Sequence, residues 1–248
     1  MINVNYGSKD RNTAYTTNFS SEYKIIQYLL DDDSPVCFDI GAHHGETIKD
    51  LREYFKTPII YAFEPDPINY NILNKSVHGM SNVYIVNKGI GSAIGQYPFY
   101  SNQLSHTNSF LKVNETSKDH IRLQKMTAHE RKDLFTKEYN REILLDMTTL
   151  DAYCNENNIQ HIDFLKIDAQ GFEIECLKGC SSMLSKVKIL KCELSFFDFY
   201  EKSNTFYDLE NLIKLYNFSL YSIPFVSQNP QNGRTDWVEV IYINNSYG

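Results

Sequence analysis

The stretch that decides the fold is VCFDIGAHHGE, which runs from Val36 to Glu46. Its first five residues form a short apolar run, and such a run predicts a buried strand. Gly41 and Gly45 then allow a tight turn whose backbone can approach a ligand closely, and a helical pattern begins directly after the turn. The first turn of that helix offers free N–H groups to a ligand. A strand, a glycine turn and a helix in this order predict one unit of an α/β fold.

Similar units follow along the chain. Short apolar runs alternate with helical patterns, and the chain closes with two apolar runs separated by a loop rich in Pro, Asn, Gln and Gly. These patterns predict a mainly parallel sheet with helices on both faces and a terminal antiparallel pair, with ligands bound at the carboxyl ends of the strands. The expected strands cover residues 36–40, 59–63, 83–86, 96–100, 162–167, 187–192, 218–223 and 237–243.

A length of 248 residues suits one α/β domain better than two independent cores. We therefore expect a single domain over residues 1–248, with an N-terminal helical extension over about residues 1–35 and an insertion over about residues 92–141. Ser20 is expected to cap a helix in the extension, and Thr127 to Glu130 are typical of a capping box in the insertion. A long insertion in a compact domain is usually a lid, a binding loop or a disordered segment, and all three remain open.

The composition narrows the class of protein. Lys and Arg number 24 against 31 Asp and Glu, so the chain lacks the broad basic surface of a nucleic-acid binder, and DNA and RNA are not expected as partners. Five cysteines, mostly inside apolar runs, indicate buried reduced thiols of a cytoplasmic protein rather than disulfides or a zinc site. No signal peptide or membrane span is expected, because no apolar run approaches about 18 residues. The oligomeric state is not indicated.

The glycine turn is the first candidate site. A dinucleotide fingerprint needs a third glycine, and Ala42 and His43 interrupt that pattern. A looser turn preceded by an acid, Asp39, favours a ligand without phosphates that carries a sulfonium and an ammonium group. An ordinary tight turn is the alternative interpretation of this motif alone.

The second candidate site is Glu64, which closes the strand at 59–63. An acid about 20 residues past the glycine turn is placed to accept hydrogen bonds from both ribose hydroxyls. Pro65 and Pro67 stiffen the loop that follows. A solvated acid at a strand end is the alternative, but two matching sites in this order favour nucleoside binding.

The third candidate site is FLKIDAQGFE, residues 164–173. Lys166 and Asp168 lie at i and i+2 on one face, and Asp168 stands where the strand reaches the expected ligand-binding edge. Gly171 permits a sharp turn into a helix, and Glu173 suits the first turn of that helix. Catalysis and helix capping are both open for Asp168.

Together these motifs resemble the FkbM family of S-adenosylmethionine-dependent O-methyltransferases, over about Val36 to Ile243. The matching blocks are FDIGA (38–42), FEP (63–65), TLD (149–151), DFLKIDAQGFE (163–173) and LKG (177–179). The resemblance implies a seven-stranded class I (Rossmann-like) methyltransferase fold with strand order 3-2-1-4-5-7-6. It also implies S-adenosylmethionine as cofactor, bound by Asp39, Gly41, Ala42, Gly45, Glu46, Glu64, Pro65, Lys88, Gly89 and Ile90.

This chain departs from the family pattern at two places. The family often has Asn and an apolar residue where His43 and His44 stand, which affects the mouth of the cofactor site. It often has Glu where Gln170 stands, and we assign Gln170 no catalytic role.

We expect Asp168, Glu193 and His106 to act on the acceptor hydroxyl. Glu193 lies near Asp168 in this fold, and His106, with Ser109, lies in the insertion and reaches the site if the insertion folds over it. A solvated loop residue is the alternative interpretation for each of them. An imidazole titrates near ~6.5, which suits a general base at neutral pH. No metal is assigned, because no His/Asp pair at ligand spacing supports one on Asp168 and Glu193.

The acceptor is expected to be a small molecule or a glycan. Two polar segments, 101–114 and 227–236 next to Trp237, offer small hydrogen-bonding groups, and Arg234 could hold a phosphate. They favour a sugar hydroxyl, in a surface polysaccharide unit or its activated precursor, although plain solvated loops have similar compositions. The alternatives are methylation of a secondary metabolite, a non-catalytic nucleoside-binding module, and an NAD-dependent oxidoreductase, which the missing third glycine disfavours.

Overall fold

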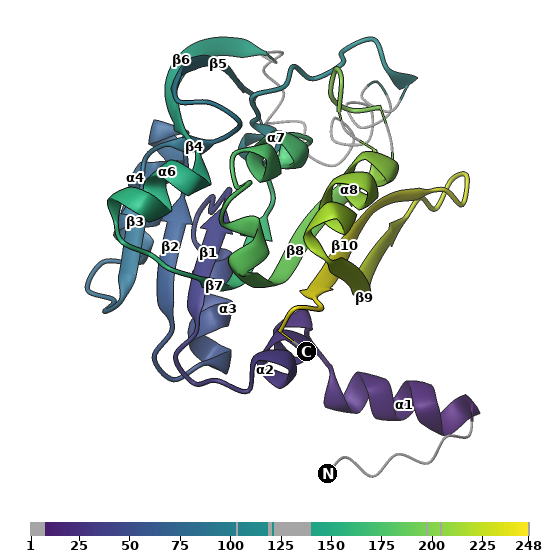
Figure 1. Cartoon of the computed structure of the whole chain (residues 1–248). Helices are drawn as coiled ribbons and strands as arrows, with labels where there is room; N and C mark the ends of the chain where they lie inside the picture. Colours follow the sequence, from purple (N-terminus) through teal and green to yellow (C-terminus); the bar gives the residue numbers. More distant parts are fainter. Residues whose placement is uncertain are drawn as a thin grey trace.

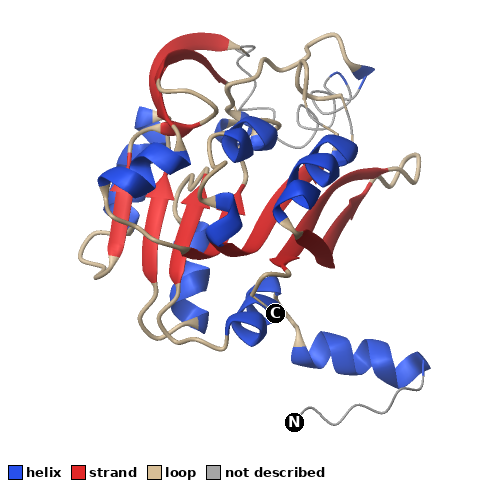
Figure 2. Cartoon of the chain, in the orientation of Figure 1, coloured by secondary structure: helices blue, strands red, loops and turns tan. Residues whose placement is uncertain are grey.

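The computed structural model describes residues 8–102, 104–118, 121, 140–196, 198–203 and 205–247. A seven-stranded sheet runs through the centre with the strand order β3-β2-β1-β7-β8-β10-β9 (Figures 1 and 2). All neighbouring strands are parallel except β10, which is antiparallel to both β8 and β9. The strands are β1 (Val36–Ile40), β2 (Ile59–Phe63), β3 (Val83–Val86), β7 (Ile162–Ile167), β8 (Val187–Ser195), β9 (Phe218–Gln228) and β10 (Thr235–Asn244).

This order is the expected 3-2-1-4-5-7-6 arrangement, so the class I methyltransferase fold is confirmed. The predicted ends of β1, β2, β3 and β7 coincide with the observed ends. Strands β8, β9 and β10 extend beyond the predicted runs. The backbone pairing of β10 with β8 on one side and β9 on the other continues past the apolar residues.

Helices cover both faces of the sheet and bury it in two apolar layers (Figure 2). Alternating strand residues face opposite layers, so Phe38 packs in one layer and Cys37 in the other. One layer includes side chains of α2 (Glu22–Leu30), α3 (Glu46–Tyr54) and α4 (Pro67–Ser76). The other includes side chains of α6 (Leu150–Glu156), α7 (Glu173–Lys178) and α8 (Phe206–Ile213).

Local capping explains where the helices begin. Helix α4 begins at Pro67, as predicted, and the Asp66 carboxylate accepts hydrogen bonds from the first backbone N–H groups. The prediction that Ser20 caps α2 is wrong by one residue. The N-cap is Ser21, whose hydroxyl accepts from the Tyr23 N–H. Before α2 lies α1 (Ser8–Asn18), which extends away from the sheet (Figure 1).

A second, three-stranded sheet with the order β4-β6-β5 combines one strand of the insertion, β5, with the two strands that flank the insertion. Its strands are β4 (Gly89–Ile90), β5 (Gly95–Ser101) and β6 (Arg141–Thr148). The strand expected at 96–100 is therefore confirmed as β5, whereas β6 was not expected. The capping box predicted at Thr127–Glu130 lies outside the described residues. The single-domain division of the chain stays a prediction.

The cysteines agree with the expectation of buried reduced thiols. All five cysteines are free and buried. Within the described ranges, no helix has the length and apolar character needed to cross a membrane.

Candidate active site

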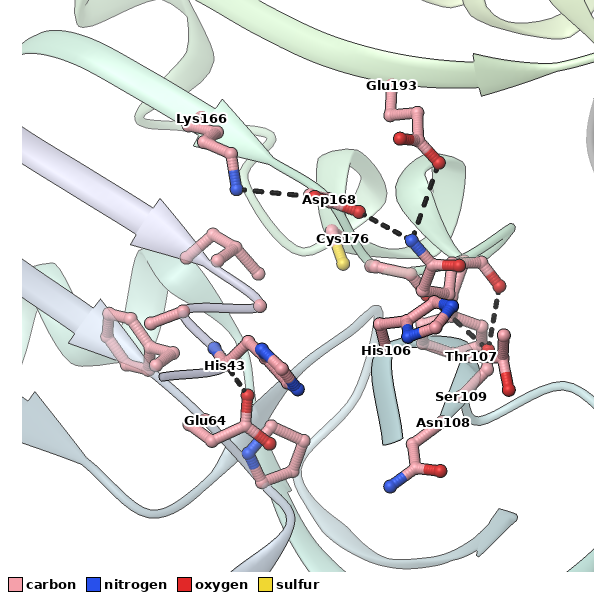
Figure 3. Close-up of a pocket in the computed structure, with 18 of the residues that line it drawn as sticks. His43, Glu64, His106, Thr107, Asn108, Ser109, Lys166, Asp168, Cys176 and Glu193 are labelled. Carbon is pink, nitrogen blue, oxygen red and sulfur yellow. Dashed lines mark hydrogen bonds and ion pairs between the residues drawn. The ribbon is translucent and has the colours of Figure 1, made fainter. Parts of the chain in front are cut away.

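A cavity of about 550 Å³ lies at the carboxyl ends of β1, β2, β7 and β8, a size typical of small-molecule sites (Figure 3). Most of the residues predicted from the sequence line it, although they come from separate strands and loops. Asp39 and Gly45 are outside the lining. The predicted residues in the lining are Gly41, Ala42, Glu46, Glu64, Pro65, Lys88, Gly89, Ile90, His106, Asp168 and Glu193.

The glycine turn is built against the neighbouring strands. Gly41 has φ +83°, and a Cβ at this position would lie 2.0 Å from the carbonyl oxygen of Asp168. Only glycine therefore fits between β1 and the end of β7. The N–H groups of Gly41 and Ala42 both donate to the carbonyl oxygen of Phe63, at 3.0 and 2.9 Å. These contacts hold the turn beside the end of β2.

Glu64 faces this turn from the end of β2 and is nearly fully buried. Its carboxylate accepts hydrogen bonds from the backbone N–H of His43 at 2.8 Å and of Asp66 at 3.0 Å (Figure 3). Burial raises the pKa of Glu64 to about 8, although the two hydrogen bonds act in the opposite direction. A buried acid at this place is suited to a polar ligand group that approaches through the cavity.

A buried ion triad links the glycine turn to the third motif. The Lys166 Nζ lies 3.2 Å from Asp39 Oδ1 and 3.4 Å from Asp168 Oδ2. Burial lowers the pKa of Lys166, but the two carboxylates outweigh it and hold that pKa well above its usual value. Burial raises the pKa of Asp39, whose Oδ2 atom is buried without a hydrogen-bond partner. The prediction that Lys166 and Asp168 share one face is confirmed.

Asp168 and Glu193 meet at the other side of the cavity through the side chain of Gln170 (Figure 3). Burial raises the pKa of Asp168, but Lys166 and the hydrogen bond from Gln170 outweigh it, so this pKa is lowered. Burial, and next the charge of Asp168, raises the pKa of Glu193 well above its usual range. The two acids expected at the acceptor hydroxyl are therefore neighbours in different protonation environments.

Residues 104–111 of the insertion, here called the crossing segment, pass over the cavity. His43 Nε2 and Ser105 Oγ are 2.9 Å apart, and the Asn108 amide donates to Asp66 Oδ2 at 2.9 Å. On the far side the Ser109 hydroxyl donates to the Gln170 carbonyl oxygen at 2.9 Å. The crossing segment therefore covers the cavity and brings His106 and Ser109 to its lining, whereas its opening as a lid stays a prediction.

The sequence motifs missed several residues that the structure places here. The Tyr200 hydroxyl lies 2.9 Å from Gln170 Oε1 and 3.0 Å from the Thr107 carbonyl oxygen. Tyr200 and Asn108 occupy loops without a recognisable motif, and His43 stood out only as a departure from the family. Arg234, named from the sequence as a residue that could hold a phosphate, pairs with Asp236 at 2.9 Å, and Asp236 lines the cavity beside Trp237.

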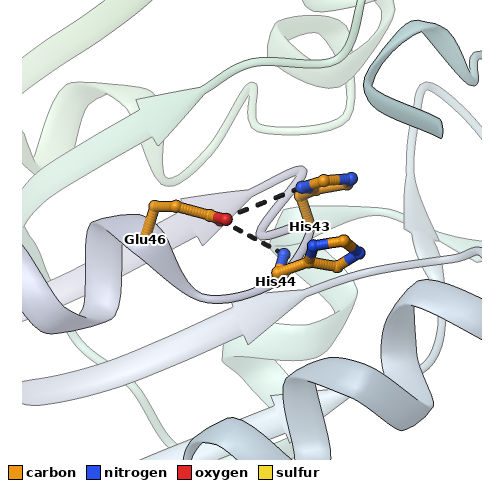
Figure 4. A group of neighbouring side chains, drawn as sticks. All are labelled: His43, His44 and Glu46. Carbon is orange, nitrogen blue, oxygen red and sulfur yellow. Dashed lines mark hydrogen bonds and ion pairs between the residues drawn. The ribbon is translucent and has the colours of Figure 1, made fainter. Parts of the chain in front are cut away.

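His43, His44 and Glu46 form a group whose ligand atoms lie close enough together for one metal ion (Figure 4). The two imidazole rings are stacked with centroids 3.7 Å apart, so their nitrogen lone pairs do not converge on one point. His44 Nε2 is also 3.3 Å from Asn69 Oδ1. The group stands at the start of α3, where the helix dipole disfavours a cation. The assignment of no metal stays a prediction.

The fold and this site together define a methyltransferase. The family model described as "Methyltransferase FkbM domain" matches residues 39–220, and the chain belongs to this family. The protein 2-O-methyltransferase NoeI of Sinorhizobium fredii is 24% identical over 179 residues, which cover 72% of this chain and 71% of NoeI. Methyltransferase sdnD of Sordaria araneosa is 28% identical over 156 residues, which cover 59% of this chain and 60% of sdnD.

Solved structures resemble the chain at low sequence identity and with TM-scores below 0.5. SMU.1697c, a putative methyltransferase from Streptococcus mutans in complex with SAH, has a TM-score of 0.46 and 10% identity, covering 90% of this chain and 96% of its own. An rRNA methylase from Streptococcus thermophilus has a TM-score of 0.40 and 10% identity, covering 89% and 93%. Likeness at this level carries no information on the acceptor, so the exclusion of nucleic acid stays a prediction.

Proposed function

We propose that this methyltransferase uses S-adenosylmethionine and methylates a sugar hydroxyl, in a surface glycan unit or its activated precursor. The observation that carries the proposal is one cavity with two distinct ends. A glycine turn and Glu64 form one end, and the acids Asp168 and Glu193 form the other. The relative named as a 2-O-methyltransferase supports an oxygen acceptor.

The first end fits the cofactor. Glu64 is placed to accept hydrogen bonds from the ribose diol, and the unpartnered Oδ2 of buried Asp39 supplies negative charge behind the turn for a cationic ligand. Lys88, Gly89 and Ile90 line the same end and are assigned to the adenine side. When bound, the cofactor supplies a methyl group that its sulfonium makes electrophilic.

The second end is assigned to the acceptor. The lowered pKa of Asp168 keeps it ionised at neutral pH, so its carboxylate can accept a hydrogen bond from the acceptor hydroxyl. Glu193 and His106 stand beside it to orient the hydroxyl and receive its proton. Orientation of the reacting groups can contribute ~7–11 kcal/mol in favourable cases, and general-base help adds ~10²–10⁴-fold.

Two features favour a carbohydrate over an apolar acceptor. The small polar residues Ser105, Thr107 and Asn108 of the crossing segment line the cavity. The Trp237 ring lines the acceptor end, and an aromatic face beside hydrogen-bonding groups suits a sugar ring. The buried free cysteines support the proposed cytoplasmic location.

A screen with labelled methyl donor tests the acceptor. Neutral oligosaccharides, sugar nucleotides, phenols, small amines and RNA are offered separately, and we expect label only in the sugars. Asp168→Asn, assayed in parallel, should remove this label if transfer occurs at the described site. Transfer to phenols, amines or RNA alone would contradict the carbohydrate proposal and leave the methyltransferase assignment standing.

A further inference from the structure

The side chain of Gln170 lies between the two acids of the acceptor end. Its Nε2 atom is 2.8 Å from Asp168 Oδ1 and 3.4 Å from Glu193 Oε1, and its Oε1 atom accepts from the Tyr200 hydroxyl at 2.9 Å (Figure 3). The backbone of Gln170 has φ +55°, a left-handed conformation that is uncommon for this residue type. Its carbonyl oxygen accepts the Ser109 hydroxyl. The residue is therefore fixed by partners from several parts of the chain.

The contact with Asp168 determines which way the amide points, because the pKa of Asp168 is lowered and an ionised carboxylate only accepts hydrogen bonds. Burial, and next the charge of Glu193, raises the pKa of Tyr200 well above its usual range, so the hydroxyl keeps its proton. That single proton is shared between the amide oxygen of Gln170 and the carbonyl oxygen of Thr107, and the amide nitrogen of Gln170 faces the acids. One N–H bond is then available for Asp168 and one for Glu193.

A neutral amide suits this place because the surroundings are already rich in charge. The charge of Asp168 already raises the pKa of Glu193, and the amide bridges the two acids without adding a third charge. Lys166 balances Asp168 from the opposite side. The other titratable groups that act on the pair come from different elements and are Glu173 on α7, Glu239 on β10, Lys191 on β8 and Tyr200.

We propose that Gln170 is a positioning residue that holds Asp168 and Glu193 at a fixed separation for the acceptor hydroxyl. This inference rests on the proposed function for its catalytic consequence. The sequence interpretation assigned Gln170 no catalytic role, and this inference adds a positioning role. In this role Gln170 acts through the two acids that it contacts.

The first test is Gln170→Asn. Asn adopts left-handed backbone readily, so the turn is retained while the amide is withdrawn by one carbon and cannot reach both acids. We expect kcat to fall by at least about tenfold with affinity for S-adenosylhomocysteine within about twofold of the wild type. Tyr200→Phe, which removes the hydroxyl contact with the amide oxygen, should lower kcat in the same direction by a smaller factor. A Gln170→Asn enzyme with kcat within twofold of the wild type would overturn the proposal.

The second test needs no acceptor. Gln170→Glu places a third carboxylate against two others, so its pKa in the folded protein rises above the unfolded value near ~4.3. The folded state then binds more protons than the unfolded state, and stability falls as pH rises. We expect the melting temperature, relative to wild type, to drop by at least about 4 °C more at about pH 8 than at about pH 5.5.

Gln96→Glu is the matched control. Gln96 also donates to a carboxylate, Asp146, at 3.0 Å, but this pair is exposed on the β5–β6 sheet and outside the cavity. The drop in melting temperature of Gln96→Glu relative to wild type should be nearly the same at both pH values. An equal, pH-independent deficit for Gln170→Glu would show that Gln170 does not hold the two acids. If wild-type protein methylates no sugar, the proposed function fails. The comparison of melting temperatures still shows whether Gln170 bridges Asp168 and Glu193.

Discussion

Replacing Asp168 with Asn is expected to lower the rate of methyl transfer by at least about 10²-fold. The substitution removes the ionised carboxylate that faces the acceptor, while Lys166 keeps its second partner, Asp39, so the fold is retained. Affinity for S-adenosylhomocysteine should stay within a few-fold, because Glu64 and the glycine turn are untouched. Single-turnover rates and calorimetric affinities, measured on the same preparation, separate the two effects.

Asp146→Asn is the control for the Asp168 prediction. Asp146 is an exposed acid that accepts one hydrogen bond from Gln96, outside the cavity. Its removal should leave the rate unchanged. Normal turnover in Asp168→Asn would make Asp168 a structural residue and move the acid–base role to Glu193 or His106.

Replacing Lys166 with Met is expected to destabilise the protein by about 3–5 kcal/mol near neutral pH. The change leaves Asp39 and Asp168 facing each other without a cation, and Asp39 is fully buried. Burial already raises the pKa of Asp39, and loss of Lys166 raises it further. The folded variant therefore takes up a proton that the unfolded chain does not, so its deficit should shrink as pH falls toward about 5. Urea unfolding at the two pH values measures this.

Lys178→Met provides the comparison. Lys178 pairs with Glu175 on the surface of α7, with about half of its side chain exposed. Such pairs contribute about 0–1 kcal/mol, so the loss should be small at both pH values. A deficit for Lys166→Met no larger than that for Lys178→Met would show that the triad does not hold the site together.

The central strands could be predicted because each is a short apolar run with clear ends. Pro35 and Gly41 bound β1, and Pro58 and Glu64 bound β2. Strand β6 could not be predicted in this way. Its sequence REILLDMT has no regular alternation, and its position depends on pairing with β5 across a long intervening segment.

The residues of the candidate site also differ in whether a local sequence pattern predicts them. Glu64 and Asp168 were predictable because parallel strands bring their carboxyl ends to one edge, so an acid after each strand faces the same cavity. Tyr200 and Asn108 were not predictable, because they lie in loops without a motif. Tyr200 contacts Gln170, which is 30 residues away in the chain, and Asn108 contacts Asp66, which is 42 residues away. The bridging role of Gln170 depends on the left-handed turn and on Tyr200, and neither is visible in a local pattern.

The cofactor assignment is tested most directly by calorimetric titration of S-adenosylhomocysteine and, separately, NAD into the wild-type chain and Glu64→Ala. Wild type should bind S-adenosylhomocysteine and give no heat with NAD. The folded Glu64→Ala variant, checked by its melting temperature, should bind about tenfold more weakly, because both ribose hydroxyls lose their partner at about 0.5–1.5 kcal/mol for each hydrogen bond. Binding of NAD without any response to S-adenosylhomocysteine would contradict the account.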